Sequence, residues 1–234
     1  MVAQEGSLAD YRRFALYYAP PEGSALANFG AAWLGWDAQT GRVVPHPDVA
    51  VPVAEVTQTP RKYGFHGTLK PPFRLAAGTD AAMLMDVAAR FAARARPFRA
   101  PPPRLRRIGP FLALTTQAPA LSAHAAALVR VFEPFRAAPM PAELDRRRAV
   151  GVDAGQEALL RQWGYPHVMR NFRFHLTLTG ALPADRLAPI EQALVPLLTP
   201  LIADPLPVRE LCVFGERPDG RFRVVRRFPF GGGL

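Results

Sequence analysis

The sequence of 234 residues has a single cysteine, Cys212, and no hydrophobic run long enough to cross a membrane. One cysteine excludes an internal disulfide framework and is typical of proteins that fold in a reducing compartment. The first residues also lack the basic start and the apolar stretch of a signal peptide. We therefore expect a cytoplasmic protein with no membrane partner.

Motifs for several common kinds of site are also absent. The chain has no Gly-rich phosphate loop of the P-loop or dinucleotide-binding type, and no serine or cysteine in the sequence context of an activated nucleophile. The two histidine motifs described below have no carboxylate or cysteine at the spacing of metal ligands. We therefore expect no cofactor and no metal.

Lysine is nearly absent from a basic chain. The net charge is +10, and of the 29 basic residues only Lys62 and Lys70 are lysines. Arginines cluster at 94–107, 146–148 and 221–227, and such a charge favours an anionic partner. Because the clusters have little aromatic interleaving and form no single basic helix, we favour a small anionic substrate over nucleic acid, which remains an alternative.

A short pattern of an apolar residue, a histidine, any residue, a threonine and an apolar residue occurs twice. The copies are Phe65-His66-Gly67-Thr68-Leu69 and Phe174-His175-Leu176-Thr177-Leu178. Residues i and i+2 of a strand point to the same face, so each copy places its histidine and threonine together. The flanking residues face the other way, into a core.

The predicted elements follow the same order in both halves of the chain. The first half reads strand, helix, histidine strand, helix and strand, and the second half repeats it. Besides the two histidine strands, we expect strands at 12–19, 104–108, 110–116, 208–214 and 222–228, and helices at 24–36, 79–96, 119–135, 153–163 and within 185–198.

This order predicts an α+β fold in a single bilobed domain, 1–234. Lobe 1 spans about 11–109, and lobe 2 spans about 110–230 with an inserted segment at 136–172. We expect two pseudo-symmetric lobes, each an antiparallel-rich sheet with helices packed outside. A central cleft would then carry one His-x-Thr motif from each lobe.

Two imidazoles and two hydroxyls in one cleft suit the cleavage of a phosphodiester. Histidine gains or loses a proton at neutral pH, so His66 and His175 could divide the roles of general acid and general base. The hydroxyls of Thr68 and Thr177 could donate to the non-bridging phosphate oxygens. Which histidine is the acid stays open at this stage.

The paired motifs resemble the two-histidine (2H) phosphoesterase superfamily, which includes RNA 2′,3′-cyclic phosphodiesterases and 2′-5′ RNA ligase-like proteins. The surrounding sequences, 61–73, 163–166 and 172–180, resemble the branch found with bacterial phosphonate-utilisation genes. The resemblance covers nearly the whole chain. It implies His66, Thr68, His175 and Thr177 as the site, and a cyclic or simple phosphodiester as the substrate.

Four further residues are candidates for substrate binding. Lys70 continues the series His66, Thr68 along the strand, and Thr179 has the equivalent place after the second motif. Arg173 precedes His175 by two residues and could contact phosphate. Tyr63 could stack on a substrate ring. Two of them also have a structural alternative, a solvent-facing side chain at the strand entry for Arg173 and a core position for Tyr63.

Three functions are compatible with these residues. The first is a metal-independent phosphodiesterase for a small cyclic or simple phosphodiester, linked to phosphonate metabolism. The second keeps the site but acts on RNA ends, as a 2′,3′-cyclic phosphodiesterase or 2′-5′ ligase-like enzyme. The third is a non-catalytic module that binds a phosphorylated ligand. We expect a monomer, and we expect segment 136–172 to cover the cleft as a lid.

Overall fold

The computed structural model describes residues 7–232, so positions 1–6 and 233–234 of the predicted domain lie outside the described residues. The α-helices are α1 (Ala25–Leu34), α2 (Val53–Val56), α3 (Gln58–Arg61), α4 (Ala81–Arg94), α5 (Pro119–Val131), α6 (Pro141–Arg148), α7 (Ala154–Trp163) and α8 (Ala184–Leu198). The strands are β1 (Phe14–Tyr18), β2 (Trp36–Asp37), β3 (Arg42–Val43), β4 (Gly67–Phe73), β5 (Phe98–Ala100), β6 (Arg104–Ile108), β7 (Phe111–Thr115), β8 (His175–Thr177), β9 (Leu206–Val208), β10 (Glu210–Glu216) and β11 (Phe222–Pro229). None of these helices combines the length and apolar character that crossing a bilayer demands.

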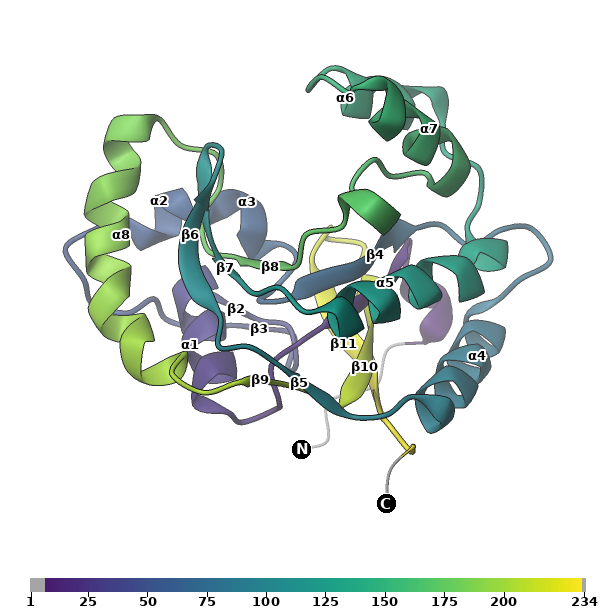
Figure 1. Cartoon of the computed structure of the whole chain (residues 1–234), viewed down its shortest axis with the longest axis horizontal. Helices are drawn as coiled ribbons and strands as arrows, with labels where there is room; N and C mark the ends of the chain where they lie inside the picture. The colour runs from purple at the N-terminus through teal and green to yellow at the C-terminus, as the bar shows by residue number, and fades with distance from the viewer. Residues whose placement is uncertain (1–6, 233–234) are drawn as a thin grey trace.

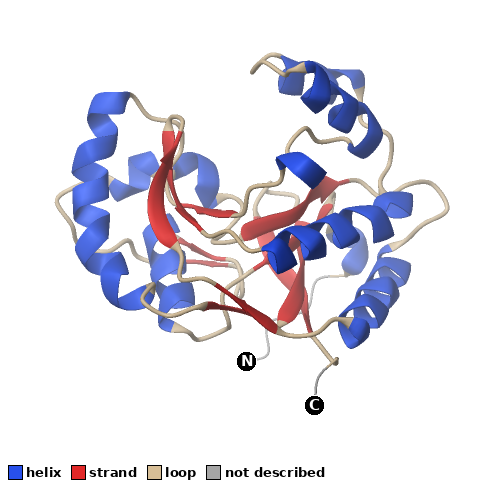
Figure 2. Cartoon of the chain, viewed as in Figure 1, coloured by secondary structure: helices blue, strands red, loops and turns tan. Residues whose placement is uncertain are grey.

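The fold is mixed α and β, built on a large antiparallel sheet with strand order β11-β10-β1-β4-β8-β7-β6 (Figure 1). Helices lie outside the sheet at both ends of the molecule (Figure 2). The two histidine strands, β4 and β8, are neighbours in the middle, and a single residue pair, Gly67 with Leu176, joins them. The two histidine strands therefore share the smallest number of paired residues of any neighbouring strands in this sheet.

Helix starts agree with the sequence because the capping side chains are in place. Ser24 accepts a hydrogen bond from the amide of Ala27 at the start of α1, and Asp80 accepts one from Met83 at the start of α4. Asp153 caps α7 through the amide of Gln156. An N-cap acceptor satisfies a backbone N–H that the helix leaves unpaired, which is why these residues mark the boundaries.

The predicted division into two contiguous lobes is wrong at its boundary near residue 110. The late strand β10 pairs with β1, β11 pairs with β10 at the same end of the sheet, and β6 pairs with β7 at the other end. Helices cross over too, since α5 packs on β4, and Trp33 of α1 donates its indole N–H to the carbonyl of Leu178. Each end of the sheet therefore draws on both halves of the chain, because β-strands and helices pair by burial rather than by sequence proximity.

Two parts of the chain hold elements that the sequence did not indicate. The segment between α1 and β4 contains the β2–β3 pair and the short helices α2 and α3, and the insertion carries α6. The helix predicted within 185–198 is present as α8, and it runs through Pro189 and Pro196 without ending. Leu187, Ile190, Leu194 and Leu198 of α8 are buried, so apolar burial outweighs the hydrogen bonds that the prolines lack.

Gly67 allows the close approach of the two histidine strands. A β-carbon at this position would lie 2.4 Å from the ring of Phe174, the residue just before His175. Phe174 itself is buried in the main hydrophobic core, against Tyr18 at a ring-centroid distance of 5.5 Å. Because Gly67 has no side chain, the ring of Phe174 can pack directly against the backbone of the first motif.

Candidate active site

The first histidine, His66, is held at the start of β4 by contacts on three sides. Its Nδ1 is 2.9 Å from the carbonyl oxygen of Gly64, and its Nε2 is 3.1 Å from Oγ1 of Thr68. Its ring stacks on Tyr17 of β1 at a centroid distance of 3.8 Å. A carbonyl only accepts hydrogen bonds, so Nδ1 carries the proton and Nε2 presents a lone pair.

The second histidine, His175, repeats this arrangement at the start of β8. Its Nδ1 is 2.8 Å from the carbonyl oxygen of Arg173, two residues earlier in the chain, just as Gly64 precedes His66 by two. The carbonyl again selects the tautomer with the proton on Nδ1, leaving Nε2 available for proton exchange. Both histidines are therefore oriented by their own backbone.

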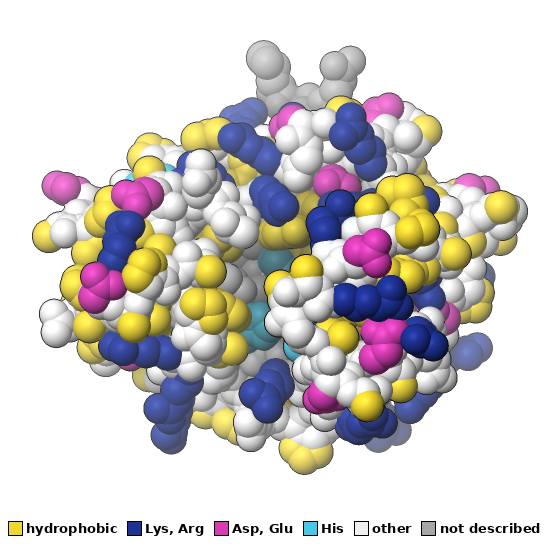
Figure 3. Space-filling view, turned by 90° about the horizontal axis from the view of Figure 1, so that it is seen from above, with side chains coloured by type: hydrophobic (Ala, Val, Ile, Leu, Met, Phe, Trp, Pro, Cys, Tyr) yellow, Lys and Arg dark blue, Asp and Glu magenta, His cyan; other side chains and the backbone are white. Residues whose placement is uncertain are grey.

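A single cavity joins the two motifs. Its volume is about 230 Å³, and residues from both histidine motifs line it, including Tyr63, His66, Phe111, Thr177 and Thr179. The ring of Phe111 also lies 5.8 Å from that of His175. Figure 3 shows histidine side chains on the floor of a hollow, with lysine and arginine side chains around its rim. The two motifs are thus brought together at one surface hollow.

Burial alters the acid–base behaviour of His66. Loss of solvent lowers its pKa to about 4, the hydrogen bond to Gly64 opposes this shift, and the positive charge of a protonated His175 adds to it. His66 is consequently a neutral imidazole at neutral pH. The Coulombic effect also indicates that the two imidazoles are close enough to interact.

Lys70 does not share the face of His66 and Thr68, contrary to the sequence prediction. Along β1, Tyr17 pairs with Thr68 but Leu16 pairs with Lys70, so Leu69 is an extra residue that shifts the register. Such a β-bulge turns the following side chain to the opposite face. Lys70 lies buried in the core, where its Nζ donates to the carbonyl of Val129 and to Oε2 of Glu133, at 3.1 and 2.9 Å.

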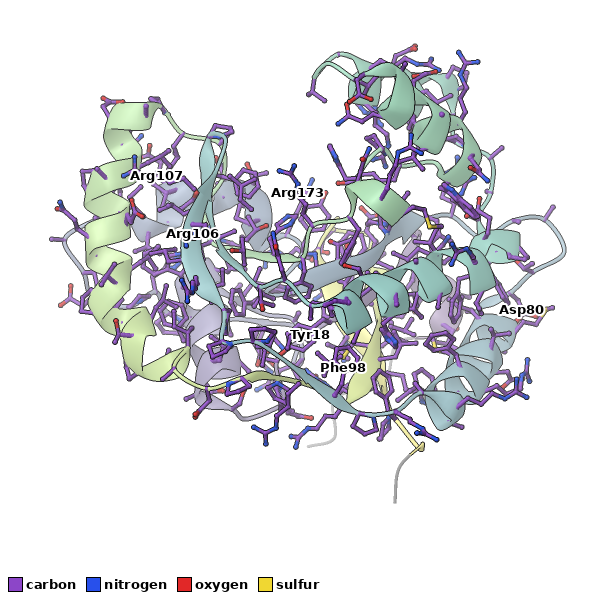
Figure 4. All side chains as sticks on the ribbon, viewed as in Figure 1. Tyr18, Asp80, Phe98, Arg106, Arg107 and Arg173 are labelled. Atoms are coloured by element: carbon purple, nitrogen blue, oxygen red, sulfur yellow. The ribbon has the colours of Figure 1, made fainter. Side chains whose placement is uncertain are left out.

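The other three predicted binding residues are placed differently from one another. Tyr63 is at the cavity, with its ring 6.0 Å from that of His66. Thr179 also lines the cavity, although β8 ends at Thr177. Its side chain is buried, and its Oγ1 accepts a hydrogen bond from the backbone N–H of Leu112, so it stabilises the backbone of β7. The exposed side chain of Arg173 points away from the sheet into the open space beneath α6 (Figure 4).

The insertion 136–172 adds residues that the sequence did not assign to the site. Its helix α7 is anchored on α5 through a small core that includes Val129, Leu159 and Val168. The guanidinium of Arg147 lies over the ring of Tyr165, at 4.7 Å from its centroid. In the sequence, the run of arginines at 146–148 was the signal that could have pointed to Arg147, but a run of basic residues is usually a solvated surface.

Arg13 is a second residue that the sequence did not indicate. It precedes β1 and forms a two-pronged ion pair with Glu216, with nitrogen–oxygen distances of 2.5 and 2.8 Å. Its guanidinium also lies 5.7 Å from the ring of Phe222. Glu216 therefore balances the charge of Arg13.

A metal site is not evident within residues 7–232, where no group of three or more His, Cys, Asp or Glu side chains could hold an ion. The side chains that line the cavity instead offer the imidazole of His66 and the hydroxyls of Tyr63 and Thr177, and His175 lies beside the lining residue Phe111. This set can exchange protons and donate hydrogen bonds to an anion.

The chain is similar to a protein family and to two curated proteins. A family profile described as "Protein of unknown function (DUF1045)" matches residues 68–223. A protein of Janthinobacterium sp. (strain Marseille) named "Ribose 1,5-bisphosphate phosphokinase PhnN" is 35% identical over 231 residues, which cover 94% of this chain and 51% of that protein. One of the same name from Laribacter hongkongensis (strain HLHK9) is 34% identical over 175 residues, covering 73% and 40%. The chain thus spans about half or less of the length of these relatives.

A solved structure, TT0787 of Thermus thermophilus, aligns with 95% of this chain and 100% of its own, at 17% identity and a TM-score of 0.43. That score is too low to establish a shared fold.

Proposed function

This chain belongs to the DUF1045 family, and from the geometry of its cleft we propose that it is a metal-independent phosphodiesterase of the two-histidine type. The observation that carries the proposal is that His66 and His175 both have Nδ1 held by the carbonyl two residues earlier. In both histidines the proton is therefore on Nδ1, and Nε2 is the ring nitrogen that can face a substrate. In this proposal, one pseudo-symmetric lobe contains β11, β10, β1 and β4, the other contains β8, β7 and β6, and the two lobes meet at Gly67 and Leu176.

His66 is the general base of the proposed reaction. Its lowered pKa, about 4, keeps it neutral at physiological pH, and a neutral imidazole can accept a proton. Nε2 takes a proton from a water molecule while the water oxygen forms a bond to phosphorus. The hydroxyl of Thr68, which donates to this nitrogen in the free protein, rotates to a non-bridging oxygen when substrate enters.

His175 is the general acid. Its ring lies beside Phe111, and its Nδ1 is held by the carbonyl of the exposed Arg173. The bond from phosphorus to the leaving oxygen breaks, and Nε2 of protonated His175 delivers a proton to that oxygen. Thr177 donates to the second non-bridging oxygen. The products are a phosphomonoester and a free hydroxyl. His66 then releases its proton to solvent and His175 takes one up, which restores both imidazoles for the next turnover.

A cyclic phosphate on a ribose-like sugar is the proposed substrate, linked to phosphonate metabolism. The relatives are named for ribose 1,5-bisphosphate, a phosphomonoester that hydrolysis of a 1,2-cyclic phosphate on a 5-phosphorylated ribose would yield. Their name denotes a phosphokinase, yet this chain has no Gly-rich phosphate loop and spans only about half their length. We therefore assign diester hydrolysis, rather than phosphoryl transfer from ATP, to this part.

Hydrolysis assays with the purified protein test the proposal. We expect turnover of ribose 1,2-cyclic phosphate, with slower or no turnover of nucleoside 2′,3′-cyclic phosphates, and no loss of activity in EDTA. Turnover of ribose 1,5-bisphosphate with ATP, and not of any diester, would instead assign the kinase activity to this chain. Saturable binding without turnover across the panel would indicate a non-catalytic module.

RNA ends are a second candidate substrate because the chain carries a net charge of +10. This function requires several phosphate contacts, so the affinity for oligonucleotides ending in a 2′,3′-cyclic phosphate would fall steeply with salt. A salt-independent affinity would remove this candidate and leave the small diester.

The pH dependence of the reaction reports on His66. Its pKa of about 4 lies below the usual value for histidine, so the imidazole stays competent as a base down to that pH. We expect kcat/KM to begin falling near pH 4 rather than near pH 6.5, in buffers where tryptophan fluorescence shows that the protein remains folded. An acidic limb centred near pH 6.5 would contradict the assignment of His66 as the base.

A further inference from the structure

Arg147 differs from the other charged side chains of α6. Glu143 pairs with Arg74, and Arg148 pairs with Glu157 and Asp145, whereas Arg146 is exposed. Arg147 is half-buried and, among the described residues, forms no ion pair; its guanidinium lies over the Tyr165 ring. The charge of Glu143 acts on Arg147 from beyond ion-pair distance, and Glu143 itself pairs with Arg74. The guanidinium of Arg147 therefore retains its donors for an external anion.

Ring contacts connect Arg147 with the side of the molecule that carries His175. The Tyr165 ring beneath its guanidinium lies 5.5 Å from the ring of His167. Burial lowers the pKa of His167, and so do the positive charges of His175, Arg173 and Arg147. Burial also lowers the pKa of Arg147, on which Tyr165, Glu143, Arg13 and Tyr63 act as well.

Arg147 is nevertheless separate from the cavity where the reaction is proposed to occur. None of the side chains that line this cavity comes from segment 136–172. Tyr63 links the two regions, because its ring lies 6.0 Å from that of His66 and it also acts on Arg147. If both histidines hold the reacting phosphate of a substrate, the part of the substrate that contacts Arg147 is therefore a different group.

We infer that Arg147, together with Arg173, binds a second phosphate of the substrate, a phosphomonoester one sugar away from the diester. The inference rests on the proposed function and names the substrate class more narrowly. A guanidinium fork matches the oxygens of a phosphate dianion, and two arginines on one side of the space supply the charge. The Tyr63 and Tyr165 rings then flank the sugar. The lid-like segment 136–172 acts as the specificity element of the site.

The test compares two diesters that differ only in the second phosphate: ribose 1,2-cyclic phosphate with and without a 5-phosphate. The wild-type protein is expected to prefer the 5-phosphorylated diester in kcat/KM. In Arg147→Ala this preference ratio falls roughly 10- to 100-fold, mainly through KM, since a charge-assisted hydrogen-bonded pair is lost. Arg147→Lys, which keeps the charge without the fork, is expected to be intermediate.

The neighbouring Arg146→Ala is the matched control, because Arg146 is exposed on the same helix. It removes one positive charge and is expected to leave the preference ratio as in the wild type. An equal fall of both kcat/KM values in Arg147→Ala would show a purely structural role and overturn the inference, as would a wild-type protein with no preference between the two diesters.

Failure of the proposed function gives a distinct result. If the wild-type protein hydrolyses neither diester, calorimetric titration with ribose 5-phosphate measures the subsite directly. Binding that weakens at least 10-fold in Arg147→Ala but not in Arg146→Ala supports the anion site without the reaction. Absence of binding to the wild type, or equal binding to both variants, overturns it.

Discussion

Replacing either His66 or His175 with alanine is expected to lower kcat/KM for a cyclic phosphodiester by roughly 10²–10⁴-fold. The two losses are of similar size because the proposed reaction needs a base on one side of phosphorus and an acid on the other. The measurement is the initial rate of hydrolysis by each variant with EDTA present. Full activity in either variant would contradict the two-histidine mechanism.

The control for these variants is His124→Phe. His124 lies outside the cleft, among the rings of Phe91, Phe98 and Phe230, at centroid distances of 5.4, 6.1 and 5.0 Å. Its Nε2 is buried with no hydrogen-bond partner, so an aromatic hydrocarbon suits the position. We expect the activity of His124→Phe to stay within about twofold of the wild type, which separates loss of an active-site imidazole from loss of any histidine.

Removing Glu133 is expected to destabilise the protein by about 3–5 kcal/mol, whereas replacing Lys70 with methionine leaves stability within about 1.5 kcal/mol. Glu133→Ala strands the buried ammonium of Lys70 with only the Val129 carbonyl as its acceptor. In Lys70→Met, Glu133 still pairs with Arg136, at 2.5 Å. Urea denaturation monitored by fluorescence measures both changes.

The same pair of variants separates a structural role for Lys70 from the substrate-binding role that its sequence position suggested. We expect Lys70→Met to hydrolyse the diester at the wild-type kcat/KM, because its side chain lies on the core face of β4. Glu191→Ala, which breaks an exposed ion pair with Arg107, is the matched control for stability and should cost at most about 1 kcal/mol. A large loss of activity in Lys70→Met would return Lys70 to the site.

Local signals in the sequence located the elements that carry the motifs. Ser24, Asp80 and Asp153 marked helix starts, because a capping acceptor acts on an amide only a few residues away. The period-two spacing of His66 and Thr68 likewise predicted their shared face, since both lie on one short stretch of strand. Each of these predictions depends on neighbours in the chain.

The same spacing rule was wrong for Lys70, two residues further on. The bulge at Leu69 arises from how β4 pairs with β1, and no local pattern in 65–73 indicates it. The boundary near residue 110 was wrong for a related reason. The strand β10 pairs with β1, from the other end of the chain, and β11 pairs with β10. Burial selects such partners, and the order of the sequence does not indicate them.

The amino-acid sequence by itself determined the two His-x-Thr motifs, the strands beneath them and the net positive charge that favours an anionic substrate. Only the tertiary structure decided that residues of both motifs line one cavity, that burial keeps His66 neutral, that Arg147 lies over the ring of Tyr165, and that Lys70 is buried in the core. The physical reason is the separation along the chain between the groups that interact. Caps and strand alternation act over a few residues, whereas desolvation and charge interactions depend on groups that only folding brings together.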